Sequence, residues 1–328
     1  LQTAIINKFS RDNDLIYQKE EITVGVGGKH IIYNAMMATL NEGDEVIIPA
    51  PYWVSYPDIT LLADGVPVIV QCSEENQFKI TPKQLEENIN SKTKWFMMNS
   101  PSNPTGSVYN YNELKDIAKV LVNYPHVMIL SDDIYEKVIY ENEKFYTIAQ
   151  VEPSLKNRTL TLNGVSKAYC MTGWRLGYAG GPKEIIAGMN KIQSQSTTST
   201  SSISMAAAVE ALNGNQAFIE KHNTAFKKRR DMVVQMLNKA KGIKCLSPLG
   251  AFYVYPNCLG CIGKKTPKGN IIQTDEDFMN YLLESEGIAG VHGAAFGLSP
   301  YFRISYATSN EILKDACNRI IRACDKLN

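Results

Sequence analysis

The chain has 328 residues with a formal net charge of +1, and 44% of its residues are hydrophobic and 20% are charged. This length and composition are typical of a globular protein of one or two domains, and the small net charge argues against electrostatic binding to nucleic acid or to an acidic membrane surface. The sequence contains no apolar stretch of about 18 residues, which a transmembrane helix would require, and no secretory signal.

Short β-branched runs alternate with helical patterns through the first two thirds of the sequence. This alternation is typical of an α/β domain with a mostly parallel sheet flanked by helices. The predicted strands lie at 22–26, 46–48, 67–71, 95–98, 127–130 and 159–162. The predicted helices lie at 31–40, 82–89, 113–122 and 183–195. In such sheets, ligands bind beyond the carboxyl ends of the strands.

After about residue 220 the pattern changes to a long helix followed by short strands. The helices are predicted at 226–240 and 311–324, and the strands at 245–246, 251–255, 287–291 and 302–306. The pattern predicts a smaller α+β domain joined by the long helix. We expect a large domain at 15–220 and a small domain formed by 1–14 and 221–328. The polar stretch 194–204 fits either a flexible linker or an ordered break between helices.

The seven cysteines are scattered, and their odd number is typical of reduced thiols in the cytoplasm. Cys258 and Cys261 form a single CxxC pair without a second pair or nearby histidines. A zinc or redox role is therefore not favoured, and no metal site is predicted.

Polar or glycine-rich clusters follow five of the predicted strands. If the strands are parallel, their carboxyl ends meet at one edge of the sheet and the clusters converge there. In chain order the clusters are Gly27-Gly28-Lys29, Pro51-Tyr52-Trp53, Asn103-Pro104, Asp132 to Tyr135, and Ser166-Lys167. Each cluster alone has an ordinary structural explanation, such as a tight turn or a helix N-cap. Their convergence is the stronger signal.

Together the clusters match the needs of pyridoxal phosphate, which requires a phosphate clamp, a lysine and an acidic partner for its ring nitrogen. The two glycines before a helix expose backbone N–H groups to an anion, and Arg175 adds a guanidinium suited to phosphate. Lys167 can form a Schiff base with an aldehyde when burial or a nearby cation lowers its pKa. Asp132 can keep a pyridine nitrogen protonated, and Tyr135 and Asn103 can bond the phenolic oxygen of the ring.

Five motifs resemble those of class I, fold-type I aminotransferases that depend on pyridoxal phosphate, and in particular the prokaryotic aspartate aminotransferase subgroup. In chain order they are ITVGVGGKHIIYN, PAPYWVSYPD, NSPSNPTG, SDDIYE and SKAYCMTGWRLGY. The similarity extends from about residue 1 to the C-terminus. It implies the fold of that family, with a large domain around a mostly parallel sheet and a smaller α+β domain.

The resemblance also implies roles for individual residues. The implied catalytic residues are Lys167 as the cofactor-bound lysine and proton shuttle, Asp132 as the partner of the ring nitrogen, and Tyr135. The implied cofactor-binding residues are Gly27, Gly28, Trp53, Asn103, Asp132, Tyr135, Ser166, Lys167 and Arg175. The implied substrate-binding residues are Lys29 for a distal carboxylate, Arg303 for the α-carboxylate, Trp53 and Asn103.

The sequence departs from the family pattern in two places. Position 164 is glycine where many relatives carry Ser or Thr, so one side-chain contact to phosphate is expected to be missing. The family also carries several dozen residues ahead of Leu1, and we expect this chain to be the remainder of a longer one. The family further implies a cis peptide bond between Asn103 and Pro104.

The implied reaction is ping-pong transamination between aspartate or glutamate and 2-oxo acids through pyridoxamine phosphate. Alternatives on the same fold are an aminotransferase for prephenate or aromatic substrates and a β-eliminating lyase. A non-enzymatic regulator that senses the cofactor is a third alternative, although no DNA-binding segment is visible. We expect a cytoplasmic homodimer with a shared active site, whose ligands are small amino acids and 2-oxo acids rather than nucleic acid or membrane.

Overall fold

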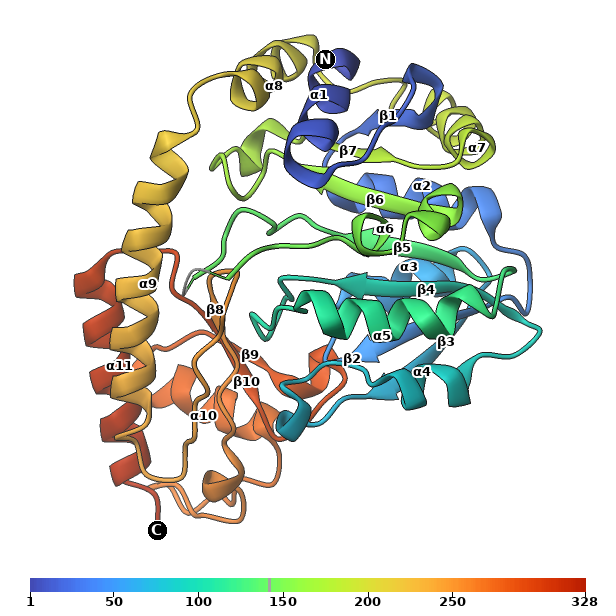
Figure 1. Cartoon of the computed structure of the whole chain (residues 1–328). Coiled ribbons are helices and arrows are strands. Elements are labelled where there is room, and N and C mark those ends of the chain that lie inside the picture. Colours follow the sequence, from blue (N-terminus) through green and yellow to red (C-terminus); the bar gives the residue numbers. More distant parts are fainter. Residues whose placement is uncertain (141–142) are drawn as a thin grey trace.

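A seven-stranded sheet forms the centre of the larger part of the molecule (Figure 1). The structure, a computed structural model, describes residues 1–140 and 143–328. The strand order across the sheet is β1-β7-β6-β5-β4-β2-β3. The strands are β1 Ile22–Gly25, β2 Glu45–Ala50, β3 Val66–Gln71, β4 Thr93–Asn99, β5 Met128–Asp132, β6 Thr159–Gly164 and β7 Gly177–Gly180.

The strands of this sheet are parallel except for β7, which runs against its two neighbours β1 and β6. The predicted mostly parallel sheet is therefore confirmed. Because β1 and β6 both oppose β7, β1 points the same way as the other strands. At the carboxyl edge, Asn99 lies opposite Asp132, and Asp132 lies opposite Leu162. The loops that follow the parallel strands are thus gathered at one edge.

Helices cover both faces of the sheet because alternate residues of each strand point to opposite sides. Val46 and Ile48 of β2 share one buried cluster with α2 and α7, whereas Ile47 shares another with α5. The helices of the first face are α2 Gly28–Thr39, α3 Ser55–Leu62 and α7 Lys183–Ser194. Those of the second face are α4 Pro82–Asn88, α5 Tyr111–Val122 and α6 Ile148–Val151.

The smaller part is built on α9 (Ala217–Leu237), the long helix at the left of Figure 1. It packs against α11 (Asn310–Asp325), and α10 (Asp275–Glu286) packs against α11 from another direction. A three-stranded antiparallel sheet in the order β8-β10-β9 completes this part. Its strands are β8 Tyr253–Val254, β9 Val291–His292 and β10 Phe302–Ser305. The predicted α+β character is confirmed, while the boundary near residue 220 stays a prediction.

Helix α1 (Gln2–Asn13) packs on the larger part of the molecule. Ile5 and Phe9 share a buried cluster with Tyr178 of β7 and Leu212 of α8 (Ser202–Asn213). Figure 1 shows α1 close to β1 and α8, far from the small sheet. The assignment of residues 1–14 to the small domain is therefore wrong, because the apolar face of α1 is buried against β7 and α8.

Other differences concern short or weakly patterned segments. The predicted strand at 245–246 does not form, and only an isolated bridge between Lys244 and Asn257 lies there. Helices α3, α6, α8 and α10 and strand β7 have no counterpart among the predicted elements. The stretch 194–204 joins α7 to α8, and the Thr200 hydroxyl donates a hydrogen bond to the Arg175 carbonyl at 3.0 Å. This contact favours the ordered break over the flexible linker.

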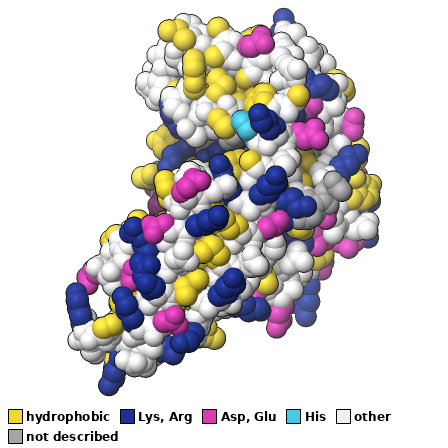
Figure 2. All heavy atoms as spheres, turned by 90° about the vertical axis from the view of Figure 1, so that its left-hand side faces the viewer, with side chains coloured by type: hydrophobic (Ala, Val, Ile, Leu, Met, Phe, Trp, Pro, Cys, Tyr) yellow, Lys and Arg dark blue, Asp and Glu magenta, His cyan; other side chains and the backbone are white. Residues whose placement is uncertain are grey.

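The face that α9 and α11 present carries interspersed basic and acidic side chains (Figure 2). Charged side chains of α11 form ion pairs, such as Arg319 with Asp315 and Arg322 with Glu286 of α10, each at 2.7 Å. Among the helices of residues 1–140 and 143–328, none is long and apolar enough to cross a membrane. In the same ranges, no group of three or more His, Cys, Asp or Glu side chains could hold a metal ion.

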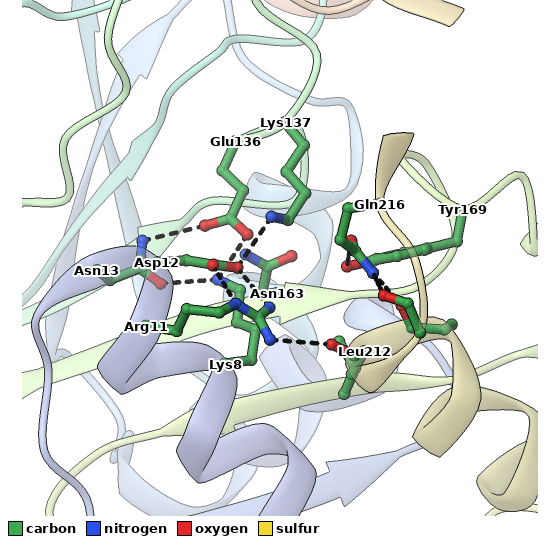
Figure 3. A network of polar contacts seen from close by, with 12 residues as sticks. Lys8, Arg11, Asp12, Asn13, Glu136, Lys137, Asn163, Tyr169, Leu212 and Gln216 are labelled. Atoms are coloured by element: carbon green, nitrogen blue, oxygen red, sulfur yellow. Dashed lines mark hydrogen bonds and ion pairs between the residues drawn. The ribbon is translucent and has the colours of Figure 1, made fainter. Parts of the chain in front are cut away.

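A buried ion pair fixes the end of α1 to the turn that follows β5 (Figure 3). The Lys8 ammonium, with no exposed surface, lies 2.5 Å from a Glu136 carboxylate oxygen. It also donates to the Asn13 side-chain oxygen at 2.7 Å, and the Asn13 amide donates to the other oxygen of Glu136 at 3.1 Å. The three side chains therefore satisfy one another in a place that water does not reach.

A second, more exposed ion-pair chain surrounds the first. Asp12 accepts from Arg11 at 2.7 Å and lies 2.9 Å from the Lys137 ammonium. Arg11 donates in turn to the Leu212 carbonyl at 3.1 Å, so α1, α8 and the turn after β5 are joined in one network. The turn that carries Asp132 and Tyr135 is thereby held from behind.

Replacing Lys8 with methionine should lower the free energy of unfolding by about 3–5 kcal/mol, because it leaves the Glu136 charge buried without a partner. Urea denaturation measures the loss. The double variant Lys8→Met with Glu136→Met should recover most of the loss, since no unpaired charge remains. Lys83→Met, which removes an exposed pair with Glu87, is the control and should leave stability unchanged. A Lys8→Met protein as stable as the parent would contradict this reading.

Candidate active site

A cavity of about 260 Å³ opens at the carboxyl edge of the parallel strands. Every predicted site residue except Gly27 and Arg303 lines it, and these two contact residues that do. The predicted residues in its wall are Gly28, Lys29, Trp53, Asn103, Asp132, Tyr135, Ser166, Lys167 and Arg175. A larger hollow of about 480 Å³ between α10 and residues 266–272 contains none of the predicted residues.

Lys167 follows β6 and is one of two lysines that line this cavity, the other being Lys29. Burial lowers its pKa, the negative charge of Asp132 opposes that effect, and the positive charges of Arg303 and Arg175 reinforce it. An amine whose pKa is lowered is unprotonated in a larger fraction of molecules at neutral pH. Lys167 can therefore act as a nucleophile toward an aldehyde or as a base.

Asp132 ends β5 and is the buried carboxylate of the cavity. Its pKa is raised to about 6, because burial raises it by more than a hydrogen bond from Tyr56, one from the Ile134 N–H and the charge of Lys167 lower it. The Tyr56 hydroxyl donates to one carboxylate oxygen at 2.7 Å, and the Ile134 N–H donates to the other at 3.3 Å. These contacts favour the ionised form, which a protonated ring nitrogen would need as its partner.

Tyr56 is a site residue that the sequence reasoning missed. It belongs to α3 and is buried, and burial raises its pKa well above the usual range, so it remains a neutral donor. Its ring meets that of Trp53 edge to face, with centroids 5.5 Å apart. The signal lay in the quoted motif PYWVSYPD, where the tyrosine follows the tryptophan by three residues and so lies on the same side of a helical turn.

Arg175 and the start of α2 form a site for an anion. Gly27 has φ +87°, and a Cβ placed on it would lie 2.5 Å from Nη2 of Arg175, so glycine is required there. Helix α2 begins at Gly28, and its first N–H groups lack partners within the helix. The guanidinium also donates to the Thr172 carbonyl at 2.9 Å, which orients it. Positive charge and free N–H groups together suit a phosphate.

Gly164 has a packing reason of its own. A Cβ at this position would lie 3.0 Å from the Leu176 carbonyl oxygen and 3.2 Å from the Gly177 Cα, where β6 and β7 pair closely. A larger side chain would push the two strands apart or require a shift. Glycine at position 164, which is expected to remove one side-chain contact to phosphate, therefore also allows β6 and β7 to lie close together.

Arg303 reaches the site from β10 of the smaller part. Its Nη1 donates to the side-chain oxygen of Asn103 at 2.8 Å, so the guanidinium lies next to the cavity wall. The rings of Tyr253 and Phe296 lie 4.6 and 4.9 Å from its central carbon. The peptide bond between Asn103 and Pro104 is cis, as expected.

Lys29 lies on the first turn of α2 and lines the cavity. Its ammonium is 5.0 Å from the centroid of the Trp53 ring. A cation over an aromatic face is held in place while its charge stays available to a ligand. The structure therefore brings together all the predicted side chains, and their individual roles stay predictions.

Comparisons with known proteins place this geometry in a family. The family model described as aminotransferase class I and II matches residues 1–320. The chain is 58% identical over 328 residues to the aspartate/prephenate aminotransferase of Cereibacter sphaeroides, covering 100% of this chain and 82% of that protein.

Solved structures agree with this match. The aspartate aminotransferase from Rhizobium meliloti has a TM-score of 0.98 at 53% identity, covering 100% of this chain and 82% of that chain. The aspartate aminotransferase from Thermus thermophilus with maleate has a TM-score of 0.90 at 39% identity, covering 98% of this chain and 81% of that chain. Since the similarity spans nearly its whole length, the chain belongs to the class I and II aminotransferase family.

Proposed function

We propose that the chain is an aspartate aminotransferase, which moves amino groups between aspartate or glutamate and 2-oxo acids. The observation that carries this proposal is that Lys167, Asp132 and Arg175 line one cavity. Relatives 58% and 53% identical to the chain are named aspartate/prephenate aminotransferase and aspartate aminotransferase.

Aminotransferases of this class use pyridoxal phosphate, and the cavity suits that cofactor. When bound, pyridoxal phosphate supplies an aldehyde that reacts with amines and a ring that withdraws electrons from the substrate α-carbon. We assign Arg175, Ser166, Gly27 and Gly28 to its phosphate, because the glycines leave open the space beside the guanidinium.

In this proposal, Lys167 moves one proton and Asp132 holds another in place. The lowered pKa of Lys167 allows its amine to take the proton from the substrate α-carbon. Asp132, kept ionised by its hydrogen bonds, is assigned to hold a proton on the ring nitrogen. Tyr135 and Asn103 are assigned to the ring hydroxyl, and Trp53 to the face of the ring.

Two cations remain for a substrate with two carboxylates. Arg303 is assigned to the α-carboxylate, for which its planar guanidinium can supply two parallel hydrogen bonds. Lys29 is assigned to the distal carboxylate of aspartate, glutamate and their oxo acids. Prephenate is a second candidate substrate, since it also carries two carboxylates and one relative is named for it. Supplying prephenate with aspartate tests this candidate.

We also propose a homodimer with a shared active site and a cytoplasmic location. Trp174, next to Arg175, is 44% exposed, which leaves apolar surface near the site for a second subunit. The seven cysteines are free thiols, which suits reducing surroundings. Sedimentation equilibrium checks the dimer.

The wild-type protein with pyridoxal phosphate should convert aspartate and 2-oxoglutarate to oxaloacetate and glutamate. Lys167→Ala should lower the rate by at least roughly 10²–10⁴, the usual contribution of a positioned proton-transfer group. A coupled assay for oxaloacetate measures both. Ammonia or pyruvate released from an amino acid without any oxo acid would favour the lyase instead, and cofactor binding without turnover would favour the regulator.

Lys29→Met should reduce kcat/KM for aspartate by roughly 10- to 100-fold, which is the effect of losing one hydrogen bond to a charged group. The methionine keeps an unbranched apolar stem against Trp53. Phenylalanine, which has no distal carboxylate, is the matched control substrate, and its kcat/KM should not change. An equal loss for both substrates would show that Lys29 does not recognise the distal carboxylate.

Tyr56→Phe should move the acid limb of the kcat/KM profile to higher pH by about 1 unit, the effect of one hydrogen bond. The Tyr56 hydrogen bond lowers the pKa of Asp132, so its removal raises that pKa, and the carboxylate becomes protonated earlier as pH falls. At pH values above the limb the rate should match wild type. Tyr17→Phe removes another buried hydroxyl, bonded to Thr161, and serves as control. An unmoved limb in Tyr56→Phe would refute this coupling.

A further inference from the structure

Tyr253 is a buried tyrosine of β8 to which the proposed function assigns no role. Its hydroxyl lies 2.9 Å from the hydroxyl of Tyr135. Tyr135 belongs to the turn after β5 in the larger part, whereas Tyr253 belongs to the small sheet. This hydrogen bond therefore crosses from one part of the molecule to the other at the wall of the cavity.

The same side chain also contacts the substrate-facing arginine. The ring of Tyr253 lies 4.6 Å from the guanidinium carbon of Arg303, and β8 pairs with β10 so that Tyr253 lies opposite Ser305. Arg303 is bonded in turn to Asn103. One tyrosine thus meets Tyr135 through its hydroxyl and Arg303 through its ring face.

Either hydroxyl of this pair can donate to the other. Burial raises the pKa of both tyrosines, so both carry their protons at neutral pH. When Tyr253 donates to the oxygen of Tyr135, the proton of Tyr135 is free to point elsewhere. The next available acceptor is a ligand oxygen in the cavity, because Tyr135 lines it.

We propose that Tyr253 is a positioning residue that aims the Tyr135 hydroxyl at the cofactor and holds the Arg303 guanidinium for the substrate carboxylate. The proposal rests on the proposed function, because it uses the roles given there to Tyr135 and Arg303. The hydroxyl and the ring of Tyr253 have different roles in this proposal. The hydroxyl acts on the cofactor, and the ring acts on the substrate.

Tyr253→Phe isolates the hydroxyl. A donor from Tyr135 stabilises the negative ring oxygen of the cofactor, so a poorly aimed donor lets that oxygen keep its proton to higher pH. The midpoint of the cofactor's visible absorbance against pH should therefore rise, by less than in Tyr135→Phe. KM for aspartate should stay within about twofold of wild type, since the ring beside Arg303 remains.

The double variant Tyr135→Phe with Tyr253→Phe provides the decisive cycle. If Tyr253 acts through Tyr135, its replacement should not shift the midpoint further once Tyr135 has lost its hydroxyl. An additional shift in the double variant, or no shift in Tyr253→Phe alone, would overturn the proposal. Tyr255→Phe is the control, because it removes a buried hydroxyl two residues along, bonded to the Leu298 carbonyl, and should leave the midpoint unchanged.

Tyr253→Leu tests the ring. Binding of maleate, a dicarboxylate without an amino group, should weaken by roughly threefold to thirtyfold relative to Tyr253→Phe, because the cation loses its aromatic face. Equal maleate affinities in the two variants would overturn this half of the proposal. A thermal unfolding curve checks that each variant is folded. Failure of the wild-type protein to bind the cofactor or to turn over aspartate would instead reject the proposed function, so the two failures are distinguishable.

Discussion

In the proposed mechanism, the Asp132 carboxylate has to stay ionised although burial favours its neutral form. Burial raises its pKa, the Tyr56 hydroxyl, the Ile134 N–H and the charge of Lys167 oppose that rise, and the resulting pKa is about 6. The same desolvation lowers the pKa of Lys167. One physical cause therefore moves an acid and an amine toward neutral pH from opposite sides, which is where proton transfer is most effective. Other contacts in the site act on Asp132 and Lys167. Hydrogen bonds from the Tyr56 hydroxyl and the Ile134 N–H favour the charged carboxylate.

The convergence of the site could be predicted because it depends on strand direction alone. A β-branched run identifies each strand, and the residues after parallel strands meet at one edge whatever the details of packing. This is why Lys167 and Asp132 could be placed at one edge of the sheet from local patterns. Tyr56 and Tyr253 were not found, because their roles depend on contacts with Asp132 and Tyr135, which lie 76 and 118 residues away in the chain. Each looks like an ordinary core aromatic until the helix or strand that carries it has been placed.

The misplacement of α1 has the same origin. The apolar residues of a helix show that one face is buried, but they do not show which surface covers it. Here the covering surface consists of β7 and α8, and the polar end of the helix meets Glu136, whose partner Asn13 is 123 residues away. Proximity in sequence therefore gave no information about the neighbours of this helix. The wrong prediction of a strand at 245–246 has a different cause. This short apolar run has no neighbouring strand to pair with, and only an isolated bridge between Lys244 and Asn257 forms there.

Side chains of the motif SDDIYE point in two directions, some toward the cavity and one toward α1. Asp132 and Tyr135 face the cavity, while Glu136 faces α1 and is paired with Lys8. A buried ion pair seldom stabilises a fold more than two apolar side chains would, because both ions lose their water. It does, however, fix direction, since the ammonium and the Asn13 amide each bond a defined oxygen of Glu136. The contacts of Glu136 thus hold the turn after β5 in one orientation. Two side chains of the smaller part contact the larger part at the site, where Tyr253 bonds to Tyr135 of this turn and Arg303 bonds to Asn103.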